Sequence, residues 1–161
     1  MSFVQQSVFF HVGQAGVAMG DQFWSLMCNE HIIDNDGLDL AYDSVDEQQR
    51  RETLFIQTRQ DRYVPRCLFV DSDNEAIQTV FSGKRKFLYH KRRALCSRAD
   101  ASAVAARAQS TEIGVPLLCK TIQQFRLLLE QSDHVNSIVI TRANGGGTGS
   151  GLTQVDRFIS F

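Results

Sequence analysis

Residues 145–151 read Gly-Gly-Gly-Thr-Gly-Ser-Gly, and they follow directly on the apolar, β-branched run Ser-Ile-Val-Ile-Thr at 137–141. Five glycines in seven positions remove the Cβ atoms that would keep a ligand away from the backbone. A strand that enters such a turn and opens a helix presents free N–H groups to an anion. The pattern therefore predicts a phosphate-binding turn. A flexible linker is the alternative, and the strand before the turn argues against it.

A second glycine-bearing turn lies near the N-terminus. Residues 7–12, Ser-Val-Phe-Phe-His-Val, are typical of a buried strand. Gly13-Gln14-Ala15-Gly16 follows, and the apolar spacing from there to His31 indicates a helix. Strand, glycine turn and helix form the first half of a mononucleotide-binding unit, so the chain contains two such turns. Neither matches GxGxxG or GxxxxGK[ST].

A further strand is predicted at 64–71, and it delivers Asp71 and Asp73 to its carboxyl end. Two carboxylates beside a phosphate site suggest Mg²⁺, which prefers oxygen ligands and keeps several waters. The alternative is that these residues cap a helix over 74–81, since aspartate and serine suit an N-cap. Spacing favours the cap, and both roles are compatible.

The remaining chain is predicted from composition and periodicity. Residues 34–63 read as a long surface loop with one short helix near 46–55, and residues 84–93 as a solvated loop. Six Lys or Arg in that second stretch leave open a patch for nucleic acid or an acidic polymer, or a targeting signal. Helices are expected at 100–109, 116–130 and 148–161, and a buried strand at 135–141.

Length and composition suit one domain of an ordinary globular protein. The chain has 161 residues, 43% of them hydrophobic and 22% charged. Because no apolar run is long enough to span a bilayer, we expect a cytosolic protein. Four scattered cysteines form no CxxC pair, which leaves a zinc site unsupported. Residues 1–80 carry 13 acidic and 5 basic side chains, whereas residues 81–161 carry 5 and 12. This asymmetry could steer an anion or a head-to-tail partner, or reflect two solvated faces.

Taken together, these motifs resemble the tubulin family. HVGQAGV at 11–17 and GGGTGSG at 145–151 are accompanied, in family order, by Trp24, Cys28-Asn29-Glu30-His31, Asn35-Asp36-Gly37 and VPRCLFVD at 64–71. The first motif and the Cys-x-Glu-His tetrad look more like the α chain than the β chain. The resemblance covers nearly the whole chain and is strongest at 8–37, 64–71 and 145–152.

The resemblance implies an α/β, Rossmann-like fold with a mostly parallel sheet flanked by helices. It also implies GTP and Mg²⁺ as cofactors, a β-tubulin-like heterodimer partner, and a place in the cytoplasm and cytoskeleton. No nucleic acid or membrane partner and no catalytic residue are expected. Asp73 stands where the family has its magnesium-associated glutamate. The positions expected to bind nucleotide are Gln14, Ala15, Asp73, Ala143, Gly145, Gly146, Gly147, Thr148 and Gly149.

The chain departs from the family pattern in several places. Asp73 is one methylene shorter than the family's glutamate, Ala103 replaces an asparagine that reaches the γ-phosphate region, and Ala143 replaces a serine. Residues 1–161 match only the N-terminal part of the GTP-binding domain, so we expect an incomplete domain that keeps the phosphate half of the site.

An incomplete domain should also expose apolar faces that the rest of a tubulin would cover. Because the family's hydrolysis loop is absent, GTP turnover is not expected from this chain alone. The alternative function is a degenerate or truncated tubulin-related protein that binds no GTP and acts through protein–protein contacts.

Overall fold

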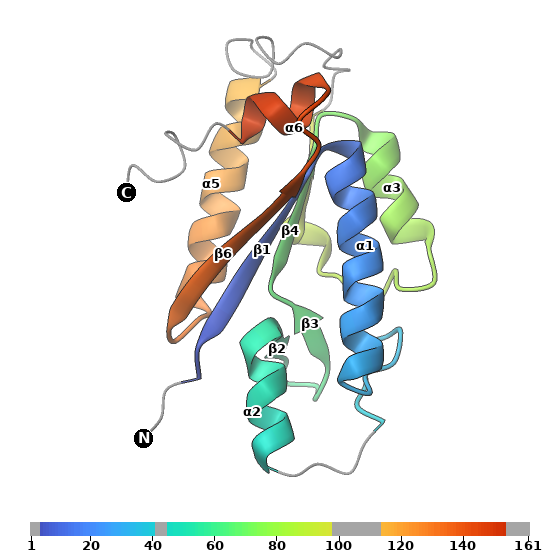
Figure 1. The fold of residues 1–161 in the computed structure, drawn as a ribbon, viewed down its shortest axis with the longest axis vertical. Coiled ribbons are helices and arrows are strands. Elements are labelled where there is room, and N and C mark those ends of the chain that lie inside the picture. The colour runs from blue at the N-terminus through green and yellow to red at the C-terminus, as the bar shows by residue number, and fades with distance from the viewer. Residues whose placement is uncertain (1–3, 41–44, 98–113, 154–161) are drawn as a thin grey trace.

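The computed structural model describes residues 4–40, 45–97 and 114–153. Its elements, coloured along the chain in Figure 1, are β1 (Gln6–Val12), α1 (Gly13–Glu30), α2 (Val45–Leu54), β2 (Phe55–Gln57), β3 (Tyr63–Pro65), β4 (Cys67–Asp71), α3 (Asn74–Ser82), η1 (Lys91–Arg93), β5 (Ala94–Cys96), α5 (Gly114–Glu130), β6 (Val135–Arg142) and α6 (Gly147–Leu152). None of the described helices is long and apolar enough to cross a membrane.

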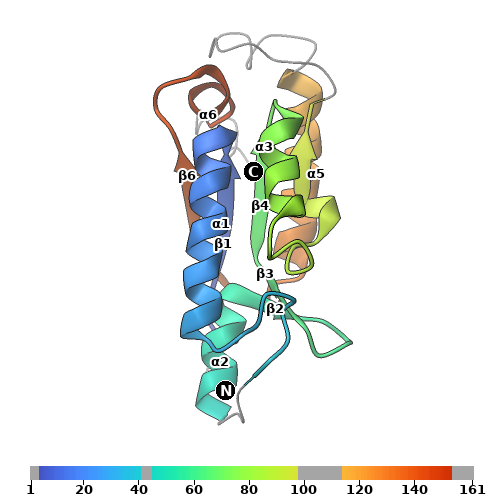
Figure 2. The same cartoon turned by 90° about the vertical axis from the view of Figure 1, so that its right-hand side faces the viewer.

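A parallel sheet with strand order β5-β4-β1-β6 forms the centre of the described structure. Helices α1 and α3 cover one face, and α5 covers the other (Figures 1 and 2). Alternating residues of β1 serve the two cores: Phe9 packs with Trp24 on the α1 side, whereas Phe10 packs with Phe125 of α5. Burial on both faces explains the continuous apolar runs in β1 and β4. The predicted α/β, Rossmann-like fold is confirmed.

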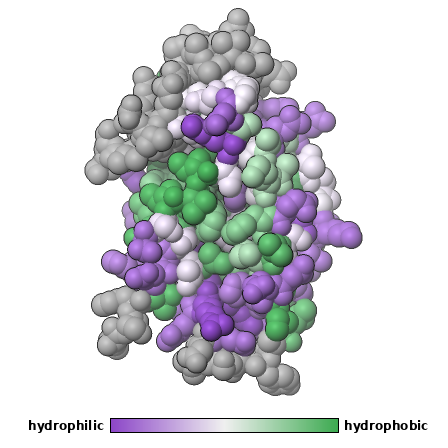
Figure 3. All heavy atoms as spheres, viewed as in Figure 1, coloured by the Kyte–Doolittle hydropathy of each residue, from purple (hydrophilic) through white to green (hydrophobic). Residues whose placement is uncertain are grey.

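Strand β6 differs from the buried strand that its sequence predicts. Ile138, Val139 and Ile140 are 51%, 38% and 39% exposed. In the described structure β6 pairs only with β1, so one edge of the strand is open. Figure 3 shows hydrophobic residues gathered over β6 on the face turned toward the viewer. The expectation of exposed apolar surface is confirmed at this edge.

The segment 34–63 is more ordered than the loop that its polar composition predicts. The predicted helix is present as α2, but β2 and β3 then form an antiparallel ribbon, and Leu38 and Arg62 make an isolated bridge. Buried Phe55 and Tyr63 fix this ribbon against the core. Three-residue strands were missed because so short a run shows no period.

The predicted strand 64–71 is broken at Arg66, where β3 ends and β4 begins. The Arg66 side chain is buried and donates hydrogen bonds to the carbonyls of Glu52 and Gln131 and to Ser132 Oγ. This guanidinium joins α2 to the end of α5, and it accounts for a charged residue inside an apolar run.

Some of the other predicted helices are present in the structure, and some lie wholly or partly outside the described residues. Helix α5 begins at Gly114, two residues before the predicted start, and α3 matches its prediction to within a residue. Helix α6 spans Gly147–Leu152. The predicted helix at 100–109, with Ala103, and the part of the last helix beyond residue 153 lie outside the described residues.

Candidate functional site

The two glycine-bearing turns meet at the carboxyl ends of β1 and β6. Gly13 has φ +75°, and a Cβ built on it would lie 3.2 Å from the backbone nitrogen of Gly149. A Cβ on Gly149 would lie 2.8 Å from the carbonyl oxygen of Ala143. A side chain at Gly13 would press against the second turn, and one at Gly149 would press against the backbone of its own turn. The sequence therefore brings together two backbone segments whose N–H groups lie at one edge of the sheet.

The two turns differ in packing: backbone atoms lie close to Gly13 in the first turn, which we call closed, whereas the start of the second turn has free space beside it, and we call it open. A Cβ at Gly145 or Gly146 would meet nothing within 4 Å. Gly146 has φ +92° and precedes α6 with no side chain capping the helix. Within the described structure, this part of the turn has free space on its outer side. An anion could approach its backbone as closely as the glycines permit.

Helix α1 adds a second uncapped N-terminus beside this space. No side chain caps its first turn, and the turn contains no acidic residue. Gln14 and Ala15 are exposed there, as expected of residues that face a ligand. Because the first N–H groups of a helix need acceptors, an anion at this end would be stabilised.

The end of β4 completes the arrangement. Ser72 and Thr148 share a hydrogen bond of 2.6 Å between their hydroxyl oxygens. This bond ties the strand that carries Asp71 to the glycine turn. The sequence suggested Ser72 only as a candidate cap for the helix over 74–81, and its bond to Thr148 was not predicted.

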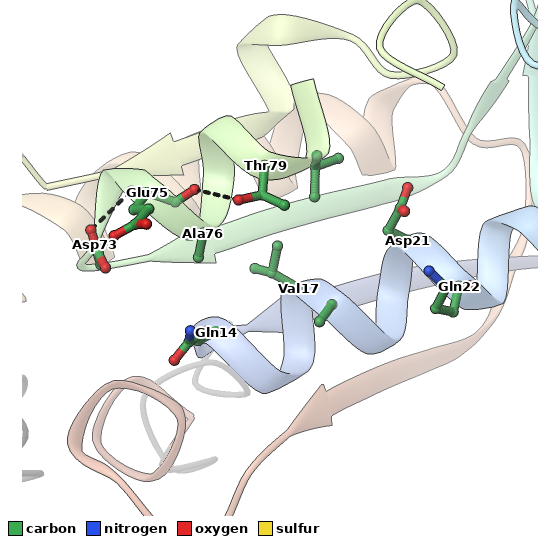
Figure 4. A pocket seen from close by; sticks show the side chains of 10 residues that line it. Gln14, Val17, Asp21, Gln22, Asp73, Glu75, Ala76 and Thr79 are labelled. Atoms are coloured by element: carbon green, nitrogen blue, oxygen red, sulfur yellow. Dashed lines mark hydrogen bonds between the residues drawn. The ribbon is translucent and has the colours of Figure 1, made fainter. Parts of the chain in front are cut away.

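Asp73 caps helix α3, because its Oδ1 accepts a hydrogen bond of 2.9 Å from the backbone nitrogen of Glu75. The capping alternative is thus confirmed. The capping residue is exposed, and its second carboxylate oxygen has no hydrogen bond described, so the cap does not exclude a ligand. Asp73 and Gln14 both line a groove of about 340 Å³ between α1 and α3, each at the first turn of its helix (Figure 4).

Asp71 is the chemically unusual residue of the group. It is 2% exposed, and its Oδ1 accepts a hydrogen bond of 3.2 Å from the backbone nitrogen of Asp73. Its Oδ2 is buried and has no hydrogen-bond partner in the described structure. Burial raises the pKa of this carboxyl above its usual range. A buried carboxylate oxygen without a partner is costly unless a proton or a cation satisfies it.

The donor set fits magnesium only if other ligands complete it. No cluster of three or more His, Cys, Asp or Glu side chains placed to hold a metal occurs among residues 4–40, 45–97 and 114–153. Mg²⁺ is commonly held by one or two carboxylates with phosphate oxygens and waters. Asp71 and Asp73 could supply that protein share beside a bound phosphate group.

A buried polar chain supports the site from beneath. Trp24 Nε1 donates to His11 Nε2 at 2.9 Å, so the other ring nitrogen, Nδ1, carries the proton and donates to Thr141 Oγ1 at 2.6 Å. Burial lowers the pKa of His11 to about 4. A Cβ on Gly20 would lie 2.3 Å from this ring. The neutral imidazole thus links α1, β1 and β6 just below the turns.

The structure brings the expected nucleotide-binding positions to one end of the sheet. Gln14 and Ala15 lie on α1, Asp73 lies at the start of α3, and Ala143 with residues 145–149 forms the turn after β6. Ala143 takes part through its backbone, against Gly149. No ligand contact of these residues is tested, so their binding roles stay predictions.

The chain is similar to tubulins over most of its length. A family model described as "Tubulin/FtsZ family, GTPase domain" matches residues 6–155. Among similar curated proteins, "Tubulin alpha chain-like 3" of Homo sapiens is 32% identical over 94% of this chain and 36% of its own length. "Tubulin alpha chain, nucleomorph" of Guillardia theta is 33% identical over 92% of this chain and 33% of its own. "Tubulin alpha-2 chain" of Caenorhabditis elegans is 33% identical, with 94% and 34% covered. The chain spans about a third of the length of these relatives.

Proposed function

The chain belongs to the tubulin/FtsZ family, and from that premise we propose that it forms the phosphate half of a GTP site in a tubulin-like cytoskeletal subunit. The observation that carries the proposal is the contact between the Gly13 and Gly149 backbones beneath the open Gly145–Gly146 segment. A packed pair of turns with an open outer side matches the needs of a polyphosphate, which takes hydrogen bonds from backbone N–H groups.

In this proposal the roles divide by element. The N–H groups of residues 145–149 and the Thr148 hydroxyl bind phosphate oxygens from one side. Gln14 and Ala15 approach from the first turn of α1. A magnesium ion bound with the nucleotide would neutralise phosphate charge, and Asp73, with Asp71 behind it, would hold that ion directly or through water.

Residues 1–161 are proposed to be the N-terminal part of a larger GTP-binding domain. Two observations support this: the open edge of β6, with Ile138, Val139 and Ile140 exposed, and the third of the relatives' length that the chain covers. Tubulin subunits, in particular a β-tubulin-like heterodimer partner, are the proposed partners, and the cytoplasmic cytoskeleton is the proposed location.

Binding of a fluorescent GTP analogue with Mg²⁺ tests the proposal. The 161-residue chain should bind it weakly and with little preference for GTP over ATP, because no described residue is placed to hold the base. A full-length subunit that carries this chain should bind it saturably. Gly145→Val should lower affinity at least about tenfold by filling the open side of the turn. Gly83→Ala, outside the site, is the matched control.

A separate variant tests the proposed magnesium-binding role of Asp73. Asp73→Asn keeps a capping oxygen for α3, since asparagine and aspartate cap equally well, but it removes the charge that a cation needs. Affinity measured with Mg²⁺ should fall, whereas affinity measured with EDTA should not change. Equal losses under both conditions would exclude a metal role for Asp73. Absence of saturable binding by the full-length subunit would refute the whole proposal.

Restoring the family residue at 143 sharpens the test. Ala143→Ser returns a hydroxyl donor beside Gly149 and should raise affinity for the analogue. If the full-length subunit binds nothing even with serine at 143 and asparagine at 103, the alternative of an interaction protein without nucleotide is favoured. The exposed apolar edge of β6 is the observation that supports this second function.

A further inference from the structure

The cationic stretch 84–93 is not used by the proposed GTP site. It follows α3 and lies on the α1–α3 side of the sheet, away from β6 (Figures 1 and 2). The structure divides its six cations into two groups. Arg85 donates to both carboxylate oxygens of Asp21, at 3.2 and 2.6 Å, and Arg93 donates to the carbonyl of Pro65 at 2.9 Å. These two arginines therefore fix the segment to the domain.

The other four cations face solvent. Lys84, Lys86, Lys91 and Arg92 are exposed, and none makes an ion pair with a carboxylate in the described part of the chain. Phe87 lies among them and is 58% exposed. The Lys86 ammonium sits 4.8 Å from the centre of the Phe87 ring. The segment thus presents an exposed apolar ring in contact with one cation, and three more exposed cations lie within five residues of it along the chain.

The backbone of this surface is held in place from three directions. Leu88 is fully buried, and the buried Tyr89 donates its hydroxyl to Asp21 Oδ1 at 2.8 Å. Arg62 Nη2 donates to the carbonyl of Phe87 at 2.9 Å. A partner that binds here would lose little free energy to ordering the loop, because its conformation is already set.

We propose that the segment Lys84–Arg93 is a docking site for an acidic polypeptide segment that places an apolar side chain on Phe87. Carboxylates of such a segment would pair with Lys84, Lys86, Lys91 and Arg92, whose charges are not neutralised within the described chain. The exposed ring would bury an aliphatic side chain, which charge pairing alone would not require.

A nucleic acid fits this surface less well. Arg62 also donates to the carbonyl of Asp36 at 2.8 Å, so the guanidinium joins the backbone at Asp36 to the backbone at Phe87. Stacking of successive bases needs several aromatic rings, and Phe87 is the exposed ring of this segment. A peptide needs only one apolar side chain to bury this ring, with carboxylates on either side of it to pair with the cations.

The test uses a fluorescein-labelled peptide of alternating glutamate and leucine, titrated with the 161-residue protein while anisotropy is recorded. Saturable binding that weakens as salt is added is expected. The double variant Lys86→Glu with Lys91→Glu should lower affinity about tenfold. Phe87→Ser should lower it severalfold without changing the salt dependence. The control, Arg50→Glu with Lys120→Glu, has the same net charge and places its changes on α2 and α5.

Four outcomes would overturn the proposal: no binding, an equal loss in the control double variant, no effect of Phe87→Ser, or equally tight binding of a labelled oligothymidylate. The last would identify a general polyanion surface instead. Circular dichroism of each variant checks that the fold is kept. Because the assay contains no GTP and leaves the glycine turns unchanged, its result is independent of GTP binding.

Discussion

The two glycine-bearing turns lie side by side, yet their glycines serve opposite purposes. In the turn after β1, Gly13 and Gly16 have backbone atoms pressed against them: a Cβ on Gly16 would lie 2.4 Å from the Thr141 carbonyl oxygen. In the turn after β6, Gly145 and Gly146 border free space. The glycines of the first turn permit close packing, whereas Gly145 and Gly146 leave space in the described structure that the proposed phosphate would fill. Similar composition therefore conceals different functions.

The largest expected effect concerns the closed turn. Gly16→Ala should destabilise the protein by about 3 kcal/mol or more, because the new methyl group meets backbone atoms that cannot rotate away. Urea denaturation followed by fluorescence of Trp24 measures the loss. Gly83→Ala, where a Cβ makes only ordinary contacts at 3.5 Å, should be nearly neutral. Equal stability of the two variants would mean that the closed turn is not closely packed.

The next effect tests whether His11 supports the closed turn from beneath. Burial lowers its folded-state pKa to about 4, from the usual imidazole value of 6.5. Below about pH 6.5 the His11 imidazole is protonated in the unfolded chain, whereas in the folded protein it stays neutral down to about pH 4. The free energy of unfolding therefore falls as the pH is lowered. The loss from His11 should be roughly 2 kcal/mol between about pH 7 and about pH 5.

Comparison with His11→Gln isolates this contribution, since His31 and His90, whose pKa values burial also lowers, remain in both proteins. The variant should be less stable at neutral pH but should lose less free energy on acidification. An unchanged pH dependence would show that His11 is not the titrating group.

A smaller loss of stability is expected in the open turn. Gly146→Ala places an alanine at φ +92° and ψ 161°, a region adopted almost only by glycine, at a cost of about 1–2 kcal/mol. Space is available there, so the cost is conformational. The same denaturation assay should report a value between those of Gly16→Ala and Gly145→Ala, and a loss as large as that of Gly16→Ala would contradict an open turn.

The smallest effect on stability sharpens the comparison most. Gly145→Ala should change the free energy of unfolding by less than about 0.5 kcal/mol, because the added methyl group meets no atom of the described residues within 4 Å. If the open side receives phosphate, the same variant should weaken binding of the GTP analogue. A neutral effect on both stability and binding would remove Gly145 from the proposed site.

Much of this arrangement could be read from the sequence, because strand, glycine turn and helix are local patterns. The strands at 7–12 and 135–141, the helices over 46–55 and 74–81 and the gathering of Asp71 with both turns follow from such patterns. The exposure of β6 could not be predicted in this way, because residues 138–140 are apolar in sequence whether or not a neighbouring element covers them. The difference between the two turns could not be predicted either, because Gly16 and Gly145 differ only in how closely other atoms pack around them.

The pairing of β1 with β6 has a consequence for the order of events during synthesis. Ser7 and Ser137, whose hydroxyls meet at 2.7 Å, are separated by 130 positions, whereas β1 and β4 pair across about half that distance. At the ribosome chains grow by about 5–20 residues per second. The second glycine turn is therefore synthesised several seconds or more after the first. Until β6 emerges, the central strand has a bare edge, and the residues that would bind phosphate do not yet form a site. If the turns bind nucleotide as proposed, binding becomes possible only after β6 has paired with β1, among the last steps by which this part of the protein matures.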